Sequence, residues 1–248
     1  MVALCYHSIA DRGPAWTSVP PDMFERQLAL LRRRGYASAG GATIEGLAGG
    51  QRSDGPLALL TFDDGYLDNH AVAFPLLRSY GFTGIFFLLP PFVDERRPLA
   101  WDEVEDRVDA HPDVMRSVGW PEVEEMADGG CEFGSHGLHH RHLPELSDEE
   151  LCEELLDSRR RIKDRVGRCD LLAYPFGEWS SRVASAAERT GYSFAFTLPR
   201  AHQPEVTRWS VPRIAVDHRD AERRFALKLH PVARRLYLSR AKARLRGA

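Results

Sequence analysis

Two adjacent carboxylates, Asp63 and Asp64, follow the most continuous short apolar run of the chain, residues 57–60 (LALL). An apolar run that ends in charge and glycine is typical of a buried strand that stops at a site. Like charges in a poorly solvated place oppose each other's ionisation, so such a pair is costly unless a cation or a reaction needs it. An Asp-Asp-Gly turn ahead of the next helix is the alternative interpretation, and this stretch alone favours neither.

A second candidate group is formed by His136 and His140, which follow a short apolar segment ending in Gly-Ser. Their spacing of four lets both imidazoles face one way if the chain turns helical there. Two imidazoles and one carboxylate leave a coordination position for water, which is the usual layout of a catalytic divalent metal. His139 and His142 flank the pair, so a histidine-rich surface loop is the alternative. The two motifs together favour a metal centre.

Strand and helix patterns alternate along most of the chain and predict a mainly parallel sheet covered by helices. A doubly wound sheet or a barrel would satisfy this order; seven or eight strand candidates favour an irregular α/β barrel, one domain over residues 1–248. Chemistry in such folds lies at the carboxyl ends of the strands. The helices are expected at residues 20–36, 67–80, 101–108, 120–127, 147–166 and 181–190, with a last one starting near 221. The residues expected at the strand ends are His7, Asp63, Asp64, His136, His140 and the turn 174–177.

Composition limits the classes of function. The 248 residues carry a formal net charge of −3, which argues against a dedicated nucleic-acid binder. No apolar stretch approaches the ~20 residues of a membrane span. The four cysteines are widely spaced and form no CxxC pair, which fits reduced thiols. The first residues lack the pattern of a signal peptide, so we expect a cytoplasmic protein.

Three stretches resemble a known family. Residues 61–66 (TFDDGY) and 134–143 (GSHGLHHRHL) resemble the first two motifs of the polysaccharide deacetylases, the NodB-homology carbohydrate esterases, and residues 172–177 (LAYPFG) resemble a variant of the third. Residues 6–9 (YHSI) and 31–36 (LRRRGY) are similar to the subgroup that acts in exopolysaccharide synthesis. The resemblance implies a distorted (β/α) barrel of about seven strands that holds one divalent metal and removes acetyl from an N-acetylated amino sugar.

The resemblance also implies roles for four of these residues. Asp64, His136 and His140 would bind the metal, and Asp63 would be the general base. A metal lowers the pKa of its bound water toward ~7, which supplies the nucleophile that deacetylation needs at neutral pH. Zinc is the default for this donor set, while iron, cobalt, nickel or manganese can occupy such a site.

The third motif implies the substrate pocket and shows one departure from the family. A backbone N–H, which we expect to be that of Tyr174, would help to hold the developing oxyanion, and Pro175 and Phe176 would shape the pocket wall. The family's motif usually begins with an arginine that orients the catalytic carboxylate, and here that position is Ala173. We hypothesise that Arg213, at a later predicted strand, supplies the missing charge; a surface arginine beside a strand is the alternative.

The general acid that protonates the leaving amine is a second departure. Residues 227–230 (LKLH) spell the family's late Leu-x-His motif, but they lie in a predicted helix, so we interpret His230 as a coincidental match. His7 ends the first strand and, in a barrel whose motif order is permuted, would lie across from Asp63. Its unperturbed pKa near ~6.5 suits proton donation at neutral pH. A structural histidine bonded to a backbone carbonyl is the alternative.

Other functions and partners stay open. The substrate sugar could be free or nucleotide-, lipid- or oligosaccharide-linked, and polymeric chitin or peptidoglycan is less favoured. A non-catalytic carbohydrate-binding relative, or a hydrolase of another C–N bond such as a formamide, is the alternative. A glycosidase fits poorly, because neighbouring carboxylates on a strand diverge. From residue 219 onward the chain is basic with apolar residues between, which predicts a solvated terminal helix or peripheral contact with an anionic membrane or lipid-linked sugar.

Overall fold

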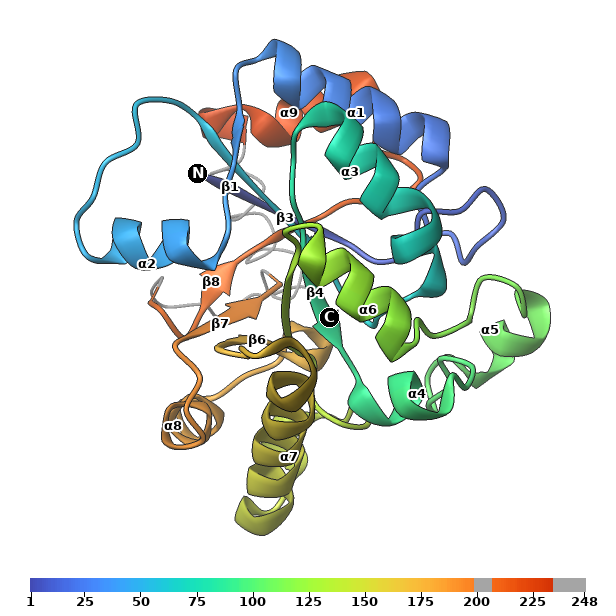
Figure 1. Cartoon of the computed structure of the whole chain (residues 1–248), viewed down its shortest axis with the longest axis vertical. Helices are drawn as coiled ribbons and strands as arrows, with labels where there is room; N and C mark the ends of the chain where they lie inside the picture. Colours follow the sequence, from blue (N-terminus) through green and yellow to red (C-terminus); the bar gives the residue numbers. More distant parts are fainter. Residues whose placement is uncertain (199–206, 234–248) are drawn as a thin grey trace, which may run out of the picture.

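The computed structural model describes residues 1–198 and 207–233 (Figure 1). Eight strands form one sheet in the order β8-β7-β6-β5-β4-β3-β1-β9, every paired neighbour is parallel, and the short β2 pairs with β3. The strands are β1 (Val2–Tyr6), β2 (Ala37–Ser38), β3 (Leu57–Phe62), β4 (Ile85–Leu88), β5 (Glu132–Ser135), β6 (Leu171–Ala173), β7 (Phe194–Thr197), β8 (Val211–Pro212) and β9 (Ile214–Ala215).

The two edges of this sheet are held by neighbouring residues of the chain. β8 pairs with β7 at one edge and β9 pairs with β1 at the other, yet the single residue Arg213 separates them. The sheet must therefore curl until its edges nearly meet, which gives an almost closed parallel barrel. The predicted irregular (β/α) barrel is confirmed, with eight strands in the nearly closed sheet where about seven were expected.

Helices surround the outside of the strands (Figure 1). Their bounds are α1 (Pro21–Arg33), α2 (Gly41–Ala48), α3 (Phe74–Tyr80), α4 (Pro90–Glu95), α5 (Glu105–Ala110), α6 (Trp120–Asp128), α7 (Asp148–Val166), α8 (Ser181–Arg189) and α9 (Glu222–Leu229). The predicted start of α7 is confirmed: the Ser147 hydroxyl accepts from the Glu150 backbone N–H at 3.2 Å, and the Glu150 carboxylate accepts from the Ser147 N–H at 2.9 Å.

Two expected helices differ from the sequence prediction. The stretch expected as one helix over 67–80 is a short π-helix, Asn69–Ala73, followed by α3. Pro75 explains the change of register, because its missing N–H removes one α-helical hydrogen bond. The helix expected over 101–108 begins later, at Glu105, and α4 was not predicted. α4 starts with two prolines, which are tolerated in a first turn where the N–H groups have no helical partner anyway.

The last described helix, α9, is not the solvated helix that the sequence suggested. Phe225 and Leu229 are buried, and α9 packs against α1. Lys228 is also buried and places its ammonium 2.5 Å from the Asp220 carboxylate. The rest of the expected basic tail, residues 234–248, lies outside the described residues. Among the described helices, none is long and apolar enough to cross a membrane.

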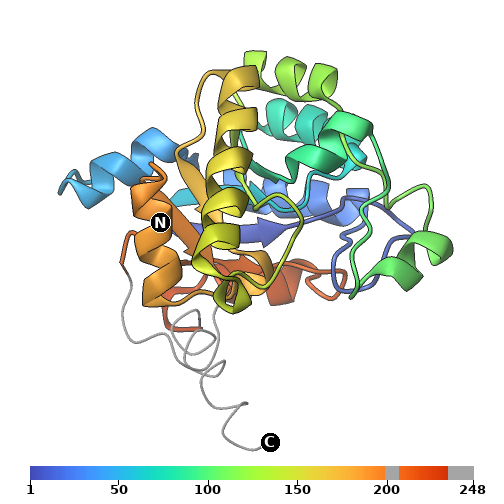
Figure 2. The ribbon, with the colours of Figure 1, turned by 90° about the horizontal axis from the view of Figure 1, so that it is seen from below.

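The hydrophobic core has two parts, because successive side chains of each strand point to opposite faces of the sheet. Ala58 and Leu60 belong to the larger cluster between the sheet and its helices, whereas Leu57 and Leu59 belong to a second cluster with Phe87 and other residues. Burial on both faces explains why β3 reads as a continuous apolar run. Since the paired strands are parallel, their carboxyl ends meet at one end of the barrel. Helix α5 lies to one side of the barrel beside the loop that follows β1, where the Arg107 guanidinium lies over the Trp16 ring (Figure 2).

Candidate metal centre

Asp64, His136 and His140 converge at the carboxyl ends of β3 and β5, as the sequence predicted. Their candidate ligand atoms all lie within 4.8 Å of one another, and all three residues are buried. The Nε2 atoms of His136 and His140 lie 3.4 and 3.6 Å from the same oxygen, Asp64 Oδ1. That oxygen is buried and has no hydrogen-bond partner within the described part of the chain. An orphaned carboxylate oxygen facing two imidazoles suits a bound cation.

The protonation states of these groups also suit a metal. Burial, and then the neighbouring charge of Asp63, raises the pKa of Asp64 well above its ordinary value. Burial lowers the pKa of His136 and of His140, so both rings are neutral at neutral pH. Metal ligands must be deprotonated, and a cation would remove the cost of ionising Asp64. The three residues therefore fit a divalent metal.

The loop that carries the two histidines is not the helical turn we had considered. Gly137 and His140 both have left-handed backbone, with φ of 83° and 58°. Glu154 of α7 holds this loop from behind: its carboxylate accepts from the backbone N–H groups of Leu138 at 2.7 Å and His139 at 3.2 Å, and from His139 Nδ1 at 2.7 Å. The flanking His139 thus serves the loop and does not point at the metal site.

Ala173 contributes a group that the sequence did not reveal. Its backbone carbonyl accepts a 2.7 Å hydrogen bond from His136 Nδ1. This bond places the remaining ring proton on Nδ1 and leaves the Nε2 lone pair directed at Asp64. The position where the family's motif has arginine therefore orients, through its backbone, a residue of the candidate metal site.

Arg213 reaches Asp63 from the seam between the two sheet edges. Its guanidinium lies 2.6 Å from Asp63 Oδ1 and 2.7 Å from Oδ2, and it also donates to the Thr61 hydroxyl at 3.0 Å. Arg213 is 0% exposed, so the alternative of a surface arginine is wrong. Burial alone would raise the pKa of Asp63, but Arg213 holds it well below the ordinary range. Asp63 is therefore ionised at neutral pH, beside but separate from the three-residue cluster.

His7 also lies at this end of the barrel, within 4.8 Å of Asp63 when ligand-type atoms are compared. Burial lowers its pKa to about 4, so the ring is neutral at neutral pH, and the sequence argument from an unperturbed pKa does not hold. Its Nδ1 is buried and finds no hydrogen-bond acceptor in the described structure. The loop around it is fixed by its backbone carbonyl, which accepts from Asn69 Nδ2 at 2.7 Å. His230 is exposed at the end of α9, away from these residues.

The turn after β6 forms part of the wall, with one correction. The Tyr174 N–H donates to the Phe196 carbonyl at 3.0 Å, so β-sheet pairing uses the group that we had expected to hold an oxyanion. The Tyr174 hydroxyl donates to the Trp209 carbonyl at 3.0 Å. Phe176 does reach the site: it has left-handed backbone, with φ of 57°, and its ring centroid lies 4.5 Å from that of His140. Pro175 is buried beside it.

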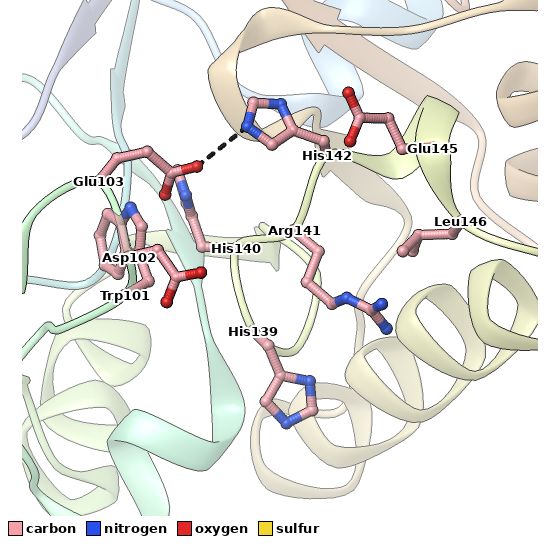
Figure 3. Close-up of a pocket in the computed structure, with 9 residues that line it drawn as sticks. All are labelled: Trp101, Asp102, Glu103, His139, His140, Arg141, His142, Glu145 and Leu146. Atoms are coloured by element: carbon pink, nitrogen blue, oxygen red, sulfur yellow. Dashed lines mark hydrogen bonds and ion pairs between the residues drawn. The ribbon is translucent and has the colours of Figure 1, made fainter.

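A pocket of about 350 Å³ opens next to His140 (Figure 3). Trp101, from the segment between α4 and α6, stacks on the His140 ring with centroids 4.1 Å apart. The position of Trp101 in the sequence carries no spacing signal toward the histidines. The lining residues are Trp101, Asp102, Glu103, His139, His140, Arg141, His142, Glu145 and Leu146.

The model of the family described as polysaccharide deacetylase matches residues 50–195, more than half of the chain. The chain belongs to the polysaccharide deacetylase family. The match includes Asp63, Asp64, His136 and His140, while His7 and Arg213 lie outside it. This match confirms the resemblance seen in the sequence motifs, and the family is one of carbohydrate deacetylases.

Two curated relatives match this polysaccharide deacetylase family member over most of its length. YxkH of Bacillus subtilis (strain 168) is 26% identical over 216 residues, which cover 86% of this chain and 70% of YxkH. Poly-beta-1,6-N-acetyl-D-glucosamine N-deacetylase of Escherichia coli (strain K12) is 24% identical over 258 residues. That match covers 92% of this chain but spans 38% of the E. coli protein.

Solved structures of other deacetylases share the fold. The Streptococcus pyogenes deacetylase PplD has a TM-score of 0.78 and 20% identity, covering 93% of this chain and 98% of PplD. IcaB from Ammonifex degensii has a TM-score of 0.70 and 24% identity, covering 97% of this chain and 96% of IcaB. At these identities the likeness establishes the architecture, and the chemistry has to be argued from this chain's own residues.

Proposed function

We propose that the protein is a metal-dependent hydrolase that removes the acetyl group from an N-acetylated amino sugar. The observation that carries the proposal is the pairing of Asp63 with Arg213 beside Asp64, His136 and His140. A protein that only bound sugar would gain nothing from two buried carboxylates held in different electrostatic states. The separation of one charged, arginine-bound carboxylate from one unpaired carboxylate is what a base next to a metal requires.

Asp64, His136 and His140 are the residues that would hold the metal. When bound, a divalent metal supplies Lewis-acid polarisation of water and of the acetyl carbonyl. Zinc is our first choice for two imidazoles and one carboxylate, and iron, cobalt, nickel and manganese are the alternatives. The neutral state of both histidines at neutral pH favours any of them.

Asp63 would accept the proton that the attacking water loses as its oxygen bonds to the acetyl carbon. Arg213 keeps Asp63 ionised and fixes the direction of its carboxylate through two hydrogen bonds. The C–N bond then breaks, and the leaving nitrogen needs a proton. His7 is neutral in the resting protein, so we propose that it passes on the proton first taken by Asp63. Pro175 and Phe176 would shape the wall against which the acetyl-bearing sugar lies.

The substrate class follows from the relatives rather than from the pocket alone. The E. coli relative is named for poly-β-1,6-N-acetyl-D-glucosamine, which supports an oligosaccharide that contains N-acetylglucosamine as the first substrate to test. Because this chain spans 38% of that protein, the substrate of the whole relative stays a proposal here. Free, nucleotide-linked and lipid-linked N-acetyl sugars, and an N-formyl sugar, are the other arms of the test.

The experiment is a screen for acetate release by the zinc-loaded protein across these substrates, with formate release measured for the N-formyl sugar. We expect release from at least one N-acetylated sugar and loss of release in Asp63→Asn at equal zinc content. Asp63→Asn with wild-type turnover would remove Asp63 as the base. A protein that binds zinc but releases no acetate from any of these sugars would contradict the proposed reaction.

The cytoplasmic location and a contact with anionic membranes stay predictions. In the described part of α9, Arg224 and Lys228 form ion pairs with Asp220 at 3.0 and 2.5 Å, which reduces the positive charge that this helix offers to a lipid surface. Any such contact would therefore depend mainly on residues 234–248. Salt-sensitive binding of the full chain to anionic vesicles, lost when these residues are removed, would support it.

A further inference from the structure

The two metal-facing histidines are supported in different ways. His136 donates its second ring nitrogen to the Ala173 carbonyl, the usual arrangement for a ligating imidazole. For His140, the corresponding Nδ1 is buried and has no hydrogen-bond partner among residues 1–198 and 207–233. His140 also has a left-handed backbone, a conformation that costs a non-glycine residue free energy. Something other than a hydrogen bond must fix the direction of its ring.

Two aromatic rings take that role. Trp101 stacks on one side of His140, with centroids 4.1 Å apart and planes at 26°. Phe176 meets the same imidazole edge-on, with centroids 4.5 Å apart and planes at 72°. Trp101 belongs to the segment between α4 and α6, and Phe176 belongs to the turn after β6. The orientation of His140 therefore depends on how these two separate segments are held together.

His142 connects the same two segments. Its Nδ1 donates to Glu178 Oε2 at 2.6 Å, just beyond the turn that carries Phe176. Its Nε2 lies 3.1 Å from Glu103 Oε1, two residues after Trp101, and this contact joins two residues that line the pocket (Figure 3). The ring itself lies flat on Phe176, with centroids 4.0 Å apart and planes at 9°.

We infer that His142 is a positioning residue for the metal centre: by bridging Glu103 and Glu178 while stacked on Phe176, it clamps Trp101 and Phe176 around His140. The clamp replaces the polar support that His140 lacks. This inference rests on the metal site of the proposed function, and it assigns a role to a histidine that the alternative interpretation of the sequence placed in a histidine-rich surface loop. It also explains why three histidines follow one another so closely in residues 139–142: one holds the loop, one faces the metal, and one fastens the wall.

The test measures zinc affinity of the purified full chain by competition with a chromophoric chelator. We expect His142→Ala to weaken zinc binding about tenfold, the size typical of lost outer-shell support. The absorption spectrum of bound Co²⁺ should also change, because the ligand ring is no longer held in one direction. His70→Ala is the matched control: His70 also pairs with a glutamate, Glu125 at 2.9 Å, and stacks on a phenylalanine, but on the outer surface. It should leave zinc affinity and the cobalt spectrum unchanged.

The glutamates separate the clamp from a general loss of structure. Glu178→Gln keeps an acceptor for His142 Nδ1 and should bind zinc nearly as the wild type does, whereas Glu178→Ala should lose affinity in the direction of His142→Ala. The double variant His142→Ala/Glu178→Ala should bind zinc no more weakly than His142→Ala alone. If His142→Ala does not fold, Glu178→Ala and Glu103→Ala carry the test, with unchanged thermal unfolding of the metal-free protein as the check on their structure.

Three outcomes would overturn the inference. The first is zinc affinity in His142→Ala equal to that of wild type and of His70→Ala. The second is full additivity of His142→Ala and Glu178→Ala. The third, if the glutamate variants carry the test, is wild-type affinity in both of them. Zinc binding without acetate release would instead count against the proposed reaction and leave the clamp standing, while a wild-type chain that binds neither zinc nor cobalt would overturn both.

Discussion

Replacing Arg213 with alanine should destabilise the protein and impair its base at the same time. The guanidinium is 0% exposed and holds both oxygens of Asp63, at 2.6 and 2.7 Å. Removing one partner of a buried, hydrogen-bonded ion pair typically costs about 3–5 kcal/mol, because the other charge is left without compensation. We expect Arg213→Ala to lower the free energy of unfolding at neutral pH by an amount in this range.

The pH dependence of this loss gives a sharper test. In the wild type the pKa of Asp63 is depressed, so the pair contributes stability above the unfolded pKa of about 4 and loses it as the pH falls further. Without Arg213, burial of Asp63 dominates and raises its pKa above the ordinary value. The variant can then take up a proton that relieves the buried charge. The difference in free energy of unfolding between wild type and Arg213→Ala should therefore shrink as the pH is lowered from 7 toward about 4.

The assay is urea denaturation of both proteins across this pH range, together with kcat/KM for acetate release and metal content. Without Arg213 the Asp63 carboxylate loses the two hydrogen bonds that fix its direction, and burial favours its protonation. We therefore expect kcat/KM at neutral pH to fall by about 100-fold or more, while metal content stays the same. The kcat/KM and the free energy of unfolding of Arg213→Lys should lie between those of wild type and Arg213→Ala, because lysine keeps the charge but cannot contact both carboxylate oxygens of Asp63.

Two controls separate the pair from general effects of losing an arginine. Arg26 forms an exposed pair with Asp22 at 2.7 Å, and Arg26→Ala should cost less than about 0.5 kcal/mol. Asp63→Asn introduced into Arg213→Ala should recover about 2 kcal/mol of the loss, because the unpaired charge is gone. An Arg213→Ala variant that unfolds with the wild-type free energy and keeps the wild-type turnover would contradict both expected losses.

Three further predictions concern other parts of the site. Burial raises the pKa of Asp68 to about 6, so between about pH 4 and 6 the folded chain holds a proton that the unfolded chain has released, and the free energy of unfolding falls as the pH rises. Asp68→Asn should remove this pH-dependent fall, which amounts to about 2 kcal/mol between pH 4 and 6 once the partial exposure of Asp68 is allowed for. The same fall in the free energy of unfolding in wild type and Asp68→Asn, measured by urea denaturation at the two pH values, would contradict it. Asp64→Asn should abolish the rise in thermal unfolding temperature that zinc gives the wild type, by removing a ligand that selects the folded state; an equal rise in both would mean that zinc binds elsewhere. His7→Ala should slow single-turnover acetate release about 100-fold while His230→Ala leaves it unchanged; slowing in His230→Ala alone would reverse the assignment.

The parts of the site that sequence could predict are those with a local signal. Asp63 and Asp64 stand out because a buried strand must end before charge, and the HxxxH pair stands out because it ends another strand. Parallel pairing then brings these strand ends together without further information. The capping box at Ser147 likewise depends on only four consecutive residues, and the structure confirms it.

The parts that could not be predicted depend on long-range closure. The pairing of Arg213 with Asp63, 150 residues away, was hypothesised from the family's missing arginine and is confirmed. Its structural cause was not predictable, because nothing in residues 211–215 shows that they split between the two edges of the sheet. The Tyr174 N–H looked available because β6 seemed to end there, but pairing with Phe196 continues one step further. The shift in the pKa of His7 follows from burial, which a sequence does not report.

The proposed reaction depends on Asp63 as the base and on Asp64, His136 and His140 as the residues that hold the metal. Its most direct test is acetate release from an N-acetylglucosamine oligosaccharide by zinc-loaded wild type and Asp63→Asn, with zinc content measured in the same samples. We expect equal zinc content in the two proteins and a loss of turnover of about 100-fold or more in the variant. Wild-type turnover in Asp63→Asn at equal zinc content would contradict it.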